Sequence, residues 1–581
     1  MIRRLPSAVL ASLLVSACAG PLASRHPVEP VTVGIVALND FHGSLEPPSQ
    51  SVFIGDGKGG AIGVPAGGAA WLASAIDSVR ARYPNHVTVS AGDLISASQL
   101  SSSLFLDEPT VSVMNRIGLD FNAVGNHEFD RGRDELLRMQ AGGCARHTAR
   151  QPCQLEPFKG ARFRFLAAST VKEDGTTLFP ATGLRSFGKG RRKVTVGFIG
   201  LTLKGTPELV ASEGIRGLTF GDEADAINAA VPRLKAAGAD AVVVLIHQGG
   251  RTQAETDPGE CRNLVGDIRP ILDRLDPGVD VVVSGHTHWA YVCDYGAINP
   301  ARPVLLTSAG VYGELVTDIA LRIDPATHRV VGKQAHNVIV QSVPYVASRG
   351  PVPNSDLVPR FAPRADISDY VARYVAAAQA FTERPVGQLA GPAARRSAGD
   401  VDYGGPLGNL IADAQLAATR GAGAQIAFMN PFGIRAPLVP GADGRVTFGM
   451  VYAVQPFNNQ LLTQTLTGAE LKALLEQSFA DSGPEQFLTP SAGFTYRVDR
   501  KAPAGERVSA ILFEGRPIDP VARYRVTTSS FLANGGDGFT ELVRQRDKVL
   551  GPTDIDALEA WLKALPARAV PEASRVTEGA R

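Results

Sequence analysis

The chain has 581 residues, of which 44% are hydrophobic and 20% charged, and its formal net charge is +1. This length is more than one hydrophobic core normally organises, so we expect at least two domains in an ordinary globular protein. A charge so close to zero gives no support to a nucleic-acid groove or a polybasic membrane patch, so charged substrates must be recognised by local groups.

The first eighteen residues have the pattern of an export signal. Arg3 and Arg4 supply a positive start, and Leu5–Val15 is an apolar stretch too short to cross a bilayer as a permanent helix. The stretch runs into Leu-Val-Ser-Ala-Cys18, which resembles a bacterial lipoprotein cleavage box. We therefore expect residues 1–18 to contain the signal peptide and Cys18 to carry a lipid.

Residues 19–30 follow as a short proline-containing tether. Ala19 is not the aspartate that often retains lipoproteins in an inner membrane, so we expect the periplasmic face of the outer membrane. The alternative is plain signal-peptidase cleavage near Ala17 or Ala19, which would leave a periplasmic or extracellular protein. With Cys18 lipidated, the only expected membrane contact is through the lipid.

The cysteine count agrees with export. Five cysteines are an odd number, and assigning Cys18 to lipid leaves Cys144, Cys153, Cys261 and Cys293. Three pairings are possible, and proximity favours Cys144–Cys153 and Cys261–Cys293. No Cys-x-x-Cys spacing suggests a zinc site, so we expect disulfides in an oxidising compartment. Four reduced buried cysteines are the alternative if the chain is not exported.

From Val31 to about Val343, short apolar runs alternate with helical patterns, which is typical of a layered α/β domain. The runs predicted to be buried strands are Val31–Leu38, Val87–Ser90, Phe121–Val124, Ala241–Ile246 and Val279–Ser284. The helical patterns are Ala69–Arg82, Arg131–Gln140 and Asp222–Ala237. We place this domain at residues 31–343.

Polar clusters follow directly after most of the predicted strands. They contain Asp40 and His42, then Asp93, then Asn126, His127 and Asp130, then His247, and finally His286 and His288. Ligands gather at the carboxyl ends of strands in such sheets, so these distant residues can converge on one site. A single such histidine is usually structural, but five of the ten histidines occupy these positions.

Oxygen and imidazole donors without a thiolate suit Mn, Zn or Fe. One bridging carboxylate with several histidines is enough for two ions about 3.5–4 Å apart, the arrangement used to hydrolyse phosphate esters. The first domain therefore has the pattern of a two-metal phosphoesterase.

A proline-rich stretch and a helix separate this domain from a second one. Residues 343–364 are expected to be a linker, and Ile367–Phe381 has helical spacing, so residues 344–385 form a linker and bridging helix. We place the second domain at 386–567 and a tail at 568–581.

The second domain has its own cluster of candidate binding residues, in loops around Asn430, Arg435, Phe457, Phe531 and Asp537. Aromatic faces can stack on a base, an aspartate can accept from ribose hydroxyls, and an arginine can pair with phosphate. We expect the loop with Phe457 to follow a short strand. Core phenylalanines beside structural glycines are the alternative interpretation.

With these motifs the chain resembles the 5′-nucleotidase family of bacterial and animal enzymes, within the calcineurin-like metallophosphoesterases, from Val31 to about residue 565. Phe531-Leu-Ala-Asn-Gly-Gly-Asp-Gly-Phe539 is the most specific segment. The resemblance implies a four-layer α/β/β/α metallophosphoesterase domain and a smaller mixed α/β C-terminal domain. It also implies that the second domain rotates on the bridging helix.

The resemblance further implies two divalent metal ions and a role for each motif residue. One ion would be held by Asp40, His42 and His288, the other by Asn126, His247 and His286, with Asp93 bridging both. His127 would be the catalytic histidine and Asp130 the carboxylate that orients it. In the second domain Phe457 and Phe531 would sandwich the base, Asp537 would bind the ribose, and Asn430 and Arg435 would bind substrate.

Two departures from the family pattern bear on the substrate. Phe432 fills a position that relatives usually give to glycine. The arginines that often bind phosphate just before Leu-Gly-Asn are missing, although Arg395 and Arg396 lie several residues earlier.

We expect hydrolysis of nucleoside 5′-monophosphates by in-line attack of a metal-bound hydroxide, with UDP-sugars as a further substrate class. The expected partner is a nucleotide and not a nucleic-acid polymer; the oligomeric state is unknown. The alternatives are a 2′,3′-cyclic-nucleotide phosphodiesterase/3′-nucleotidase, a sulfur-oxidation hydrolase on the same fold, and a nucleotide-binding lipoprotein without turnover.

Overall fold

The computed structural model describes residues 29–579 except 149, 211, 254–255, 348–349, 399–400, 458, 480–484, 544–545 and 572–574. The expected signal peptide, Cys18 and most of the tether lie outside the described residues. No helix among the described residues is long and apolar enough to cross a membrane.

Two six-stranded sheets form the centre of the N-terminal domain. The first sheet has, in spatial order, β16 (Arg329–Ile339), β15 (Leu315–Asp324), β1 (Val31–Leu38), β4 (His86–Ser90), β5 (Phe121–Ala123) and β6 (Arg164–Leu166). The second has β13 (Ala290–Asp294), β14 (Leu305–Ala309), β12 (Val281–Ser284), β11 (Ala241–His247), β9 (Val194–Thr202) and β8 (Thr182–Phe187).

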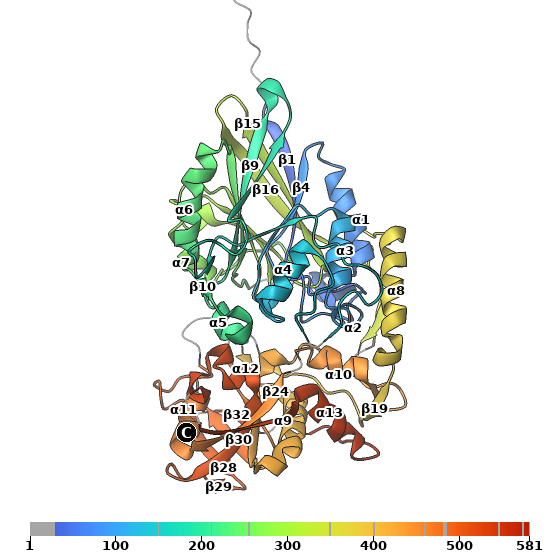
Figure 1. The fold of residues 1–581 in the computed structure, drawn as a ribbon, viewed down its shortest axis with the longest axis vertical. Coiled ribbons are helices and arrows are strands. Elements are labelled where there is room, and N and C mark those ends of the chain that lie inside the picture. Colours follow the sequence, from blue (N-terminus) through green and yellow to red (C-terminus); the bar gives the residue numbers. More distant parts are fainter. Residues whose placement is uncertain are drawn as a thin grey trace, which may run out of the picture.

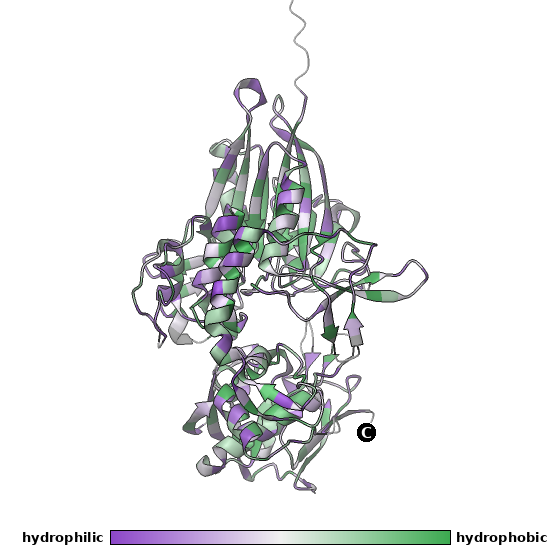
Figure 2. Ribbon diagram, turned by 90° about the vertical axis from the view of Figure 1, so that its right-hand side faces the viewer, coloured by the Kyte–Doolittle hydropathy of each residue, from purple (hydrophilic) through white to green (hydrophobic). Residues whose placement is uncertain are grey.

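Hydrophobic clusters on both faces of each sheet create four layers. Between the sheets, β-branched residues from both pack together, for example Val33, Val89 and Val243. The outer face of the first sheet packs on α1 (Ala69–Arg80) and α3 (Glu108–Ile117), and that of the second on α6 (Glu223–Ala236) and α7 (Ile268–Asp273). Figure 2 shows these central strands in green. The predicted α/β/β/α fold is confirmed.

The inner strands run parallel, and this places the motif loops together. Strand β1 pairs in parallel with β4, and β4 with β5, while β11 pairs in parallel with β9 and β12. The strands that precede the motifs therefore end at the same edge of the two-sheet stack. The polar clusters follow these ends, so the fold gathers them as expected.

A long helix, α8 (Ala365–Thr382), connects the N-terminal domain to the C-terminal domain. Its buried residues Ile367, Tyr370 and Tyr374 pack into the same core as α1 and α3. Figure 1 shows α8 running along one side of the molecule and ending above β19 (Pro385–Gln388). The proline-rich stretch before it contains a small hairpin, β17 (Tyr345–Ala347) and β18 (Gly350–Val352).

The C-terminal domain is also mixed α/β. Its larger sheet has β26 (Thr489–Pro490), β22 (Ile426–Met429), β30 (Arg523–Ser529), β24 (Gln460–Thr467) and β31 (Arg546–Thr553). A second sheet has β29 (Arg516–Pro517), β28 (Val508–Phe513), β27 (Phe494–Val498) and β32 (Val576–Glu578). The main helices are α9 (Gly405–Thr419), α11 (Gly468–Glu476) and α13 (Asp554–Lys563).

Local sequence signals start several helices. Thr467 accepts a hydrogen bond from the backbone of Glu470, whose carboxylate in turn accepts from the backbone N–H of Thr467, so a capping box begins α11. Asp222 caps α6 in a similar way by accepting from the backbone N–H of Asp225.

The prediction that the Phe457 loop follows a strand is wrong. The preceding residues form helix α10 (Phe448–Val454). Thr447 accepts a hydrogen bond from the backbone N–H of Met450 and so starts a helix. In the apolar run Val451 to Val454, Val451, Tyr452 and Val454 are buried, and such short apolar runs do not distinguish a helix from a strand.

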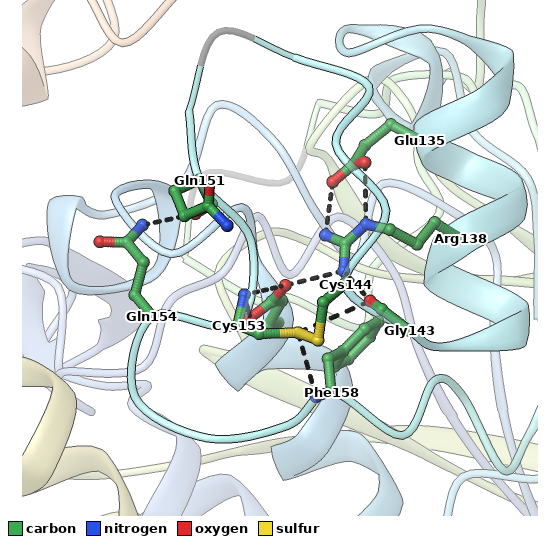
Figure 3. Close-up of a disulfide and its surroundings, with 9 residues drawn as sticks. Glu135, Arg138, Gly143, Cys144, Gln151, Cys153, Gln154 and Phe158 are labelled. Atoms are coloured by element: carbon green, nitrogen blue, oxygen red, sulfur yellow. Dashed lines mark hydrogen bonds and ion pairs between the residues drawn. A yellow bond between two sulfur atoms is a disulfide. The ribbon is translucent and has the colours of Figure 1, made fainter.

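The structure contains the disulfides Cys144–Cys153 and Cys261–Cys293. Figure 3 shows the first beside Arg138, which pairs with Glu135. Arg138 also pairs with the buried Glu108. The backbone N–H of Cys153 donates to Glu108 at 3.0 Å. The bridge therefore fixes the loop that covers these buried charges.

We predict that replacing Cys144 and Cys153 together by serine lowers the free energy of unfolding by about 2–3 kcal/mol, because closing a loop of this length restricts the unfolded chain. Urea denaturation followed by circular dichroism measures the change. An unchanged unfolding midpoint would show that the bridge contributes nothing.

Candidate functional site

Most of the predicted metal ligands have strained backbone conformations. Positive φ angles occur at Asp40, His42, Asp93, His286 and His288, five of the seven expected ligands. Non-glycine residues rarely adopt such angles, and they concentrate at functional sites. Each of these residues lies in a loop directly after a central strand, where the chain must turn sharply to aim its side chain into the site.

Asp93 lies between two imidazoles. Its Oδ2 is 3.0 Å from His247 Nε2 and 3.7 Å from His42 Nε2. His247 Nε2 also lies 3.1 Å from Asn126 Oδ1. One oxygen of Asp93 therefore lies close to an imidazole from each of the two predicted ligand groups.

Asp40 forms the second focus of the site. Its Oδ1 is 3.3 Å from His288 Nε2 and 4.0 Å from His42 Nε2, and these two nitrogens are 3.2 Å apart. The Asp40 carboxylate also accepts from the backbone N–H of His286, whose ring centroid lies 5.3 Å from that of His247.

Two sets of donors converge closely enough to hold a cation. The ligand atoms of Asp40, His42 and His288 lie within 4.8 Å of one another, and so do those of Asp40, Asp93 and His247. The structure therefore places Asp40 near both sets, whereas the sequence assigned it to one ion. His286 and Asn126 adjoin the second set.

The donor chemistry fits divalent metal ions. The Nδ1 atoms of His42 and His247 lie 3.0 Å and 2.8 Å from the carbonyl oxygens of Ser96 and Ala91. These contacts favour protonation at Nδ1 and leave Nε2 free to bind a metal. Burial holds the pKa of His42 well below its ordinary value and lowers the pKa of His286 to about 3, which favours the neutral form that binds metals.

His127 points into the site and is held by a carboxylate. Its Nδ1 lies 2.8 Å from Asp130 Oδ2, and its backbone N–H donates to Asp93 Oδ1 at 2.9 Å. Burial disfavours the charged ring, but the carboxylates of Asp130 and Asp93 outweigh burial, so the pKa of His127 lies above its ordinary value. Both features suit a group that stabilises negative charge.

The sequence analysis missed the role of Glu128. Its buried carboxylate accepts hydrogen bonds from the backbone N–H groups of Asp93 (2.9 Å), Leu94 (2.8 Å) and Gly125 (2.6 Å). Glu128 thus joins the loops that carry Asp93 and Asn126. Its place inside the motif was visible in the sequence, but its function depends on which loops lie next to each other.

Asn39 is a second residue that the sequence analysis missed. Its side chain donates to Asp40 Oδ2 at 2.8 Å and to the carbonyl of Gly310, and it accepts from the backbone N–H of Ala309. This amide therefore fixes the Asp40 carboxylate against a neighbouring strand. Its adjacency to Asp40 was the only signal in the sequence.

One cavity of about 890 Å³ joins this site to the C-terminal domain. Predicted site residues from both domains line it: Asp93, Asn126, His127, Asp130, His286, His288, Asn430, Arg435, Phe457, Phe531 and Asp537. The other three predicted ligands, Asp40, His42 and His247, are buried behind its wall. The structure therefore brings all the predicted metal, catalytic and substrate residues to one place.

The C-terminal wall of the cavity is preorganised. Asn430 Nδ2 donates to Asp537 Oδ2 at 2.7 Å, and burial raises the pKa of Asp537. The ring of Phe531 lies over Gly536, where an added Cβ would come within 2.6 Å of it, so only glycine fits there. Arg435 Nη2 is buried and has no hydrogen-bond partner among the described residues.

An aromatic contact joins the two domains inside the cavity. The rings of His127 and Phe457 stack with centroids 5.7 Å apart and an interplanar angle of 15°. Phe457 is also close to Arg435, whose guanidinium carbon lies 5.9 Å from the ring centroid. The cavity is therefore closed on one side by residues of both domains.

Comparisons with known proteins agree with this geometry. Residues 34–290 match the calcineurin-like phosphoesterase family and residues 385–544 match the C-terminal domain of 5′-nucleotidases. A 5′-nucleotidase precursor from Thermus thermophilus has a similar structure, with a TM-score of 0.73 and 26% identity over 94% of this chain and 99% of that one.

The chain belongs to the 5′-nucleotidase family. This is a family of metal-dependent phosphoester hydrolases. An endonuclease, YhcR, of Bacillus subtilis (strain 168) is 30% identical over 542 residues, which are 93% of this chain but 40% of that protein. A Thermus thermophilus sulfate thiohydrolase, SoxB, has the same fold, with a TM-score of 0.67 and 18% identity over 94% of this chain and 97% of that one.

The two departures from the 5′-nucleotidase family pattern both lie at the cavity. Phe432 and Arg395 line it. Arg395 donates to the carbonyl of Pro431 at 3.2 Å and pairs with Asp402 at 3.4 Å, which holds its guanidinium at the wall. Arg396 instead lies over the ring of Tyr403.

We predict that Glu128→Gln lowers metal affinity about 10–100-fold, the usual effect of losing a residue that positions ligands. One amide oxygen cannot replace a carboxylate that accepts three N–H groups. Metal content after dialysis against buffered Mn²⁺ measures the effect. Glu135→Gln is the matched control, because Glu135 is also buried but bonds to Arg138; an equal loss in both variants would contradict the prediction.

Proposed function

We propose that this protein hydrolyses nucleoside 5′-monophosphates, with UDP-sugars as a further substrate class. One observation carries the proposal: a single cavity has metal-binding groups and His127 on one wall and two phenylalanines with an aspartate on the other. A nucleotide carries its phosphate, ribose and aromatic base in the order in which the cavity presents the metal-binding groups, the aspartate and the phenylalanines.

The N-terminal wall would hold two divalent ions through the seven predicted ligands, with Asp93 between them. When bound, such ions acidify a water molecule and offset charge on the phosphoryl oxygens. The protein's own part is to fix the donors. Asn39 and Glu128 hold the loops of Asp40 and Asp93, and the carbonyls of Ser96 and Ala91 set the tautomers.

His127 would stabilise the phosphoryl group as its negative charge shifts. The proton on Nδ1 is held by Asp130, and Nε2, when protonated, can donate to a phosphoryl oxygen. The raised pKa of His127 favours this protonated form. His127 is thus the proposed catalytic residue and Asp130 the residue that orients it.

The C-terminal wall would bind the nucleoside. Phe457 and Phe531 offer ring faces for a base, and Asp537, fixed by Asn430, can accept from ribose hydroxyls. Arg435 and Arg395 bring positive charge to the cavity and would replace the missing upstream arginines. We also propose export, and lipid attachment at Cys18, from the sequence pattern at the start of the chain.

We predict that the chain without residues 1–18 releases phosphate from AMP, that EDTA abolishes the release, and that Mn²⁺ restores it. Colorimetric phosphate detection follows the reaction. Failure to cleave AMP, with hydrolysis of 2′,3′-cyclic AMP or of sulfur substrates instead, would overturn the choice of substrate. If none of these compounds is hydrolysed in a metal-dependent way, the protein binds nucleotides without turning them over.

We predict that His127→Ala lowers kcat for AMP about 10²–10³-fold, the usual loss when one charge-stabilising group is removed. Metal content should stay normal, because the predicted ligand set does not include His127. The control is His86→Ala, which removes an exposed imidazole from the opposite edge of the sheet. Unchanged kcat with normal metal content would remove the catalytic role.

We predict that Phe531→Ala raises KM for AMP about 10-fold or more, since stacking on a base contributes about 1–3 kcal/mol. Hydrolysis of ribose 5-phosphate, which has no base, should change little. Steady-state kinetics with both substrates separates the effects. Equal losses for the two substrates would show that Phe531 only supports the fold.

A further inference from the structure

The turn between β8 and β9 carries cations that the proposed function does not use. Residues 188–193 read Gly-Lys-Gly-Arg-Arg-Lys, and all of them are exposed. Among the described residues, the side chains of Lys189, Arg191, Arg192 and Lys193 have no ion-pair or hydrogen-bond partner. Such unpaired charges are free to attract an external anionic group.

A second turn adds two cations at the same end of the molecule. Arg322 and Arg329, beside the turn from β15 to β16, are exposed and have no such partner within the described structure either. In this turn His328 Nδ1 lies 2.6 Å from Asp240 Oδ1, and Asp240 Oδ2 accepts from the backbone N–H of Thr195, just after the basic turn. Asp240 thus links the two turns.

These six cations define the basic end: Lys189, Arg191, Arg192, Lys193, Arg322 and Arg329. Two acids at these turns are engaged locally. Asp240 is buried in the contacts just described, and Asp324 accepts from Ala326 and Thr327 within its own turn. The whole-chain charge of +1 therefore conceals a local cationic surface, for which the composition alone gave no support.

The basic end faces away from the catalytic cavity. Strand β9 starts at Val194 beside the basic turn and runs parallel to β11, which ends at the predicted ligand His247. The cations and the site therefore lie at opposite edges of the sheets. In Figure 1 the β8–β9 turn, in teal, is at the top of the molecule and the C-terminal domain is at the bottom.

The chain also enters the fold at the basic end. Val31, the first residue of β1, pairs with Ile323 beside the second turn. Cys18, the expected lipid site, precedes Val31 by thirteen residues, which can span at most about 45 Å. An anchor at Cys18 would therefore keep the basic end close to the membrane surface.

We propose that the basic end docks on anionic phospholipid headgroups and so orients the catalytic cavity away from the bilayer. Each Lys or Arg side chain near an anionic surface adds to binding. A single lipid chain holds a protein on a membrane only weakly, whereas a lipid chain together with a basic cluster gives stable attachment. Docking this way leaves the cavity open to substrates in the surrounding fluid. The inference does not depend on which substrate is cleaved.

The test is vesicle sedimentation of the chain without residues 1–18, so that no lipid contributes. Phosphatidylcholine vesicles with and without phosphatidylglycerol are compared at low and high salt. Arg191→Glu/Arg192→Glu/Lys193→Glu is the test variant. Its matched control is Lys501→Glu/Arg516→Glu/Arg523→Glu, which makes the same charge change at exposed positions of the C-terminal domain.

The parent and the control should bind the phosphatidylglycerol vesicles in a salt-dependent way, and the test variant should bind roughly tenfold more weakly or worse. Normal phosphate release by both variants would show that they are folded. Equal weakening in both variants would mean that only net charge matters, and would overturn the proposal. Absence of binding by the parent, or binding to duplex DNA but not to vesicles, would also overturn it.

Discussion

The burial of Asp40 and Asp93 is the constraint on which the rest of the site depends. Two carboxylates with at most 1% exposure stand at the edge where both sheets end, and buried charges need partners. Part of the need is met by imidazoles and by backbone N–H groups, and the donor sets around the two carboxylates are close enough together to hold a divalent cation. Burial of the two carboxylates also accounts for the strained loops and for the buried Asn39 and Glu128. The loops must turn sharply to bring the donors together, and Asn39 and Glu128 hold the donors in one arrangement.

The same constraint explains a glycine in the motif Gly125-Asn126-His127. An added Cβ at Gly125 would lie 2.1 Å from Asp93 Oδ1 and 2.8 Å from Glu128 Oε2, inside the cluster of oxygens. The loop can therefore approach the Asp93 carboxylate only without a side chain. His127 follows two residues later, and its backbone N–H donates to the same carboxylate, so the positions of His127 and Asp93 are coupled.

Much of this site could be predicted from the sequence, because its motif residues lie directly after the strands that position them. The strand ends, the motif residues directly after them and the fold class all follow from apolar runs and short polar clusters, and β1 was predicted with its observed bounds. What failed or was missed depends on tertiary neighbours. Helix α10 has the short apolar run of a strand, Glu128 acts on a loop 34 residues away, and the basic end joins two turns that are far apart in the chain.

The fold alone does not select the substrate. The sulfate thiohydrolase SoxB, with 18% identity and a TM-score of 0.67, shares the architecture of this chain, and its activity concerns sulfur rather than nucleotides. Side chains that line the cavity can make this choice, and several lie on its C-terminal wall. Phe457 and Phe531 offer ring faces to a flat aromatic group, and Asp537, held by Asn430, can accept from hydroxyls. Phe432 lines the same cavity as Asn430, at a position where this chain departs from its family.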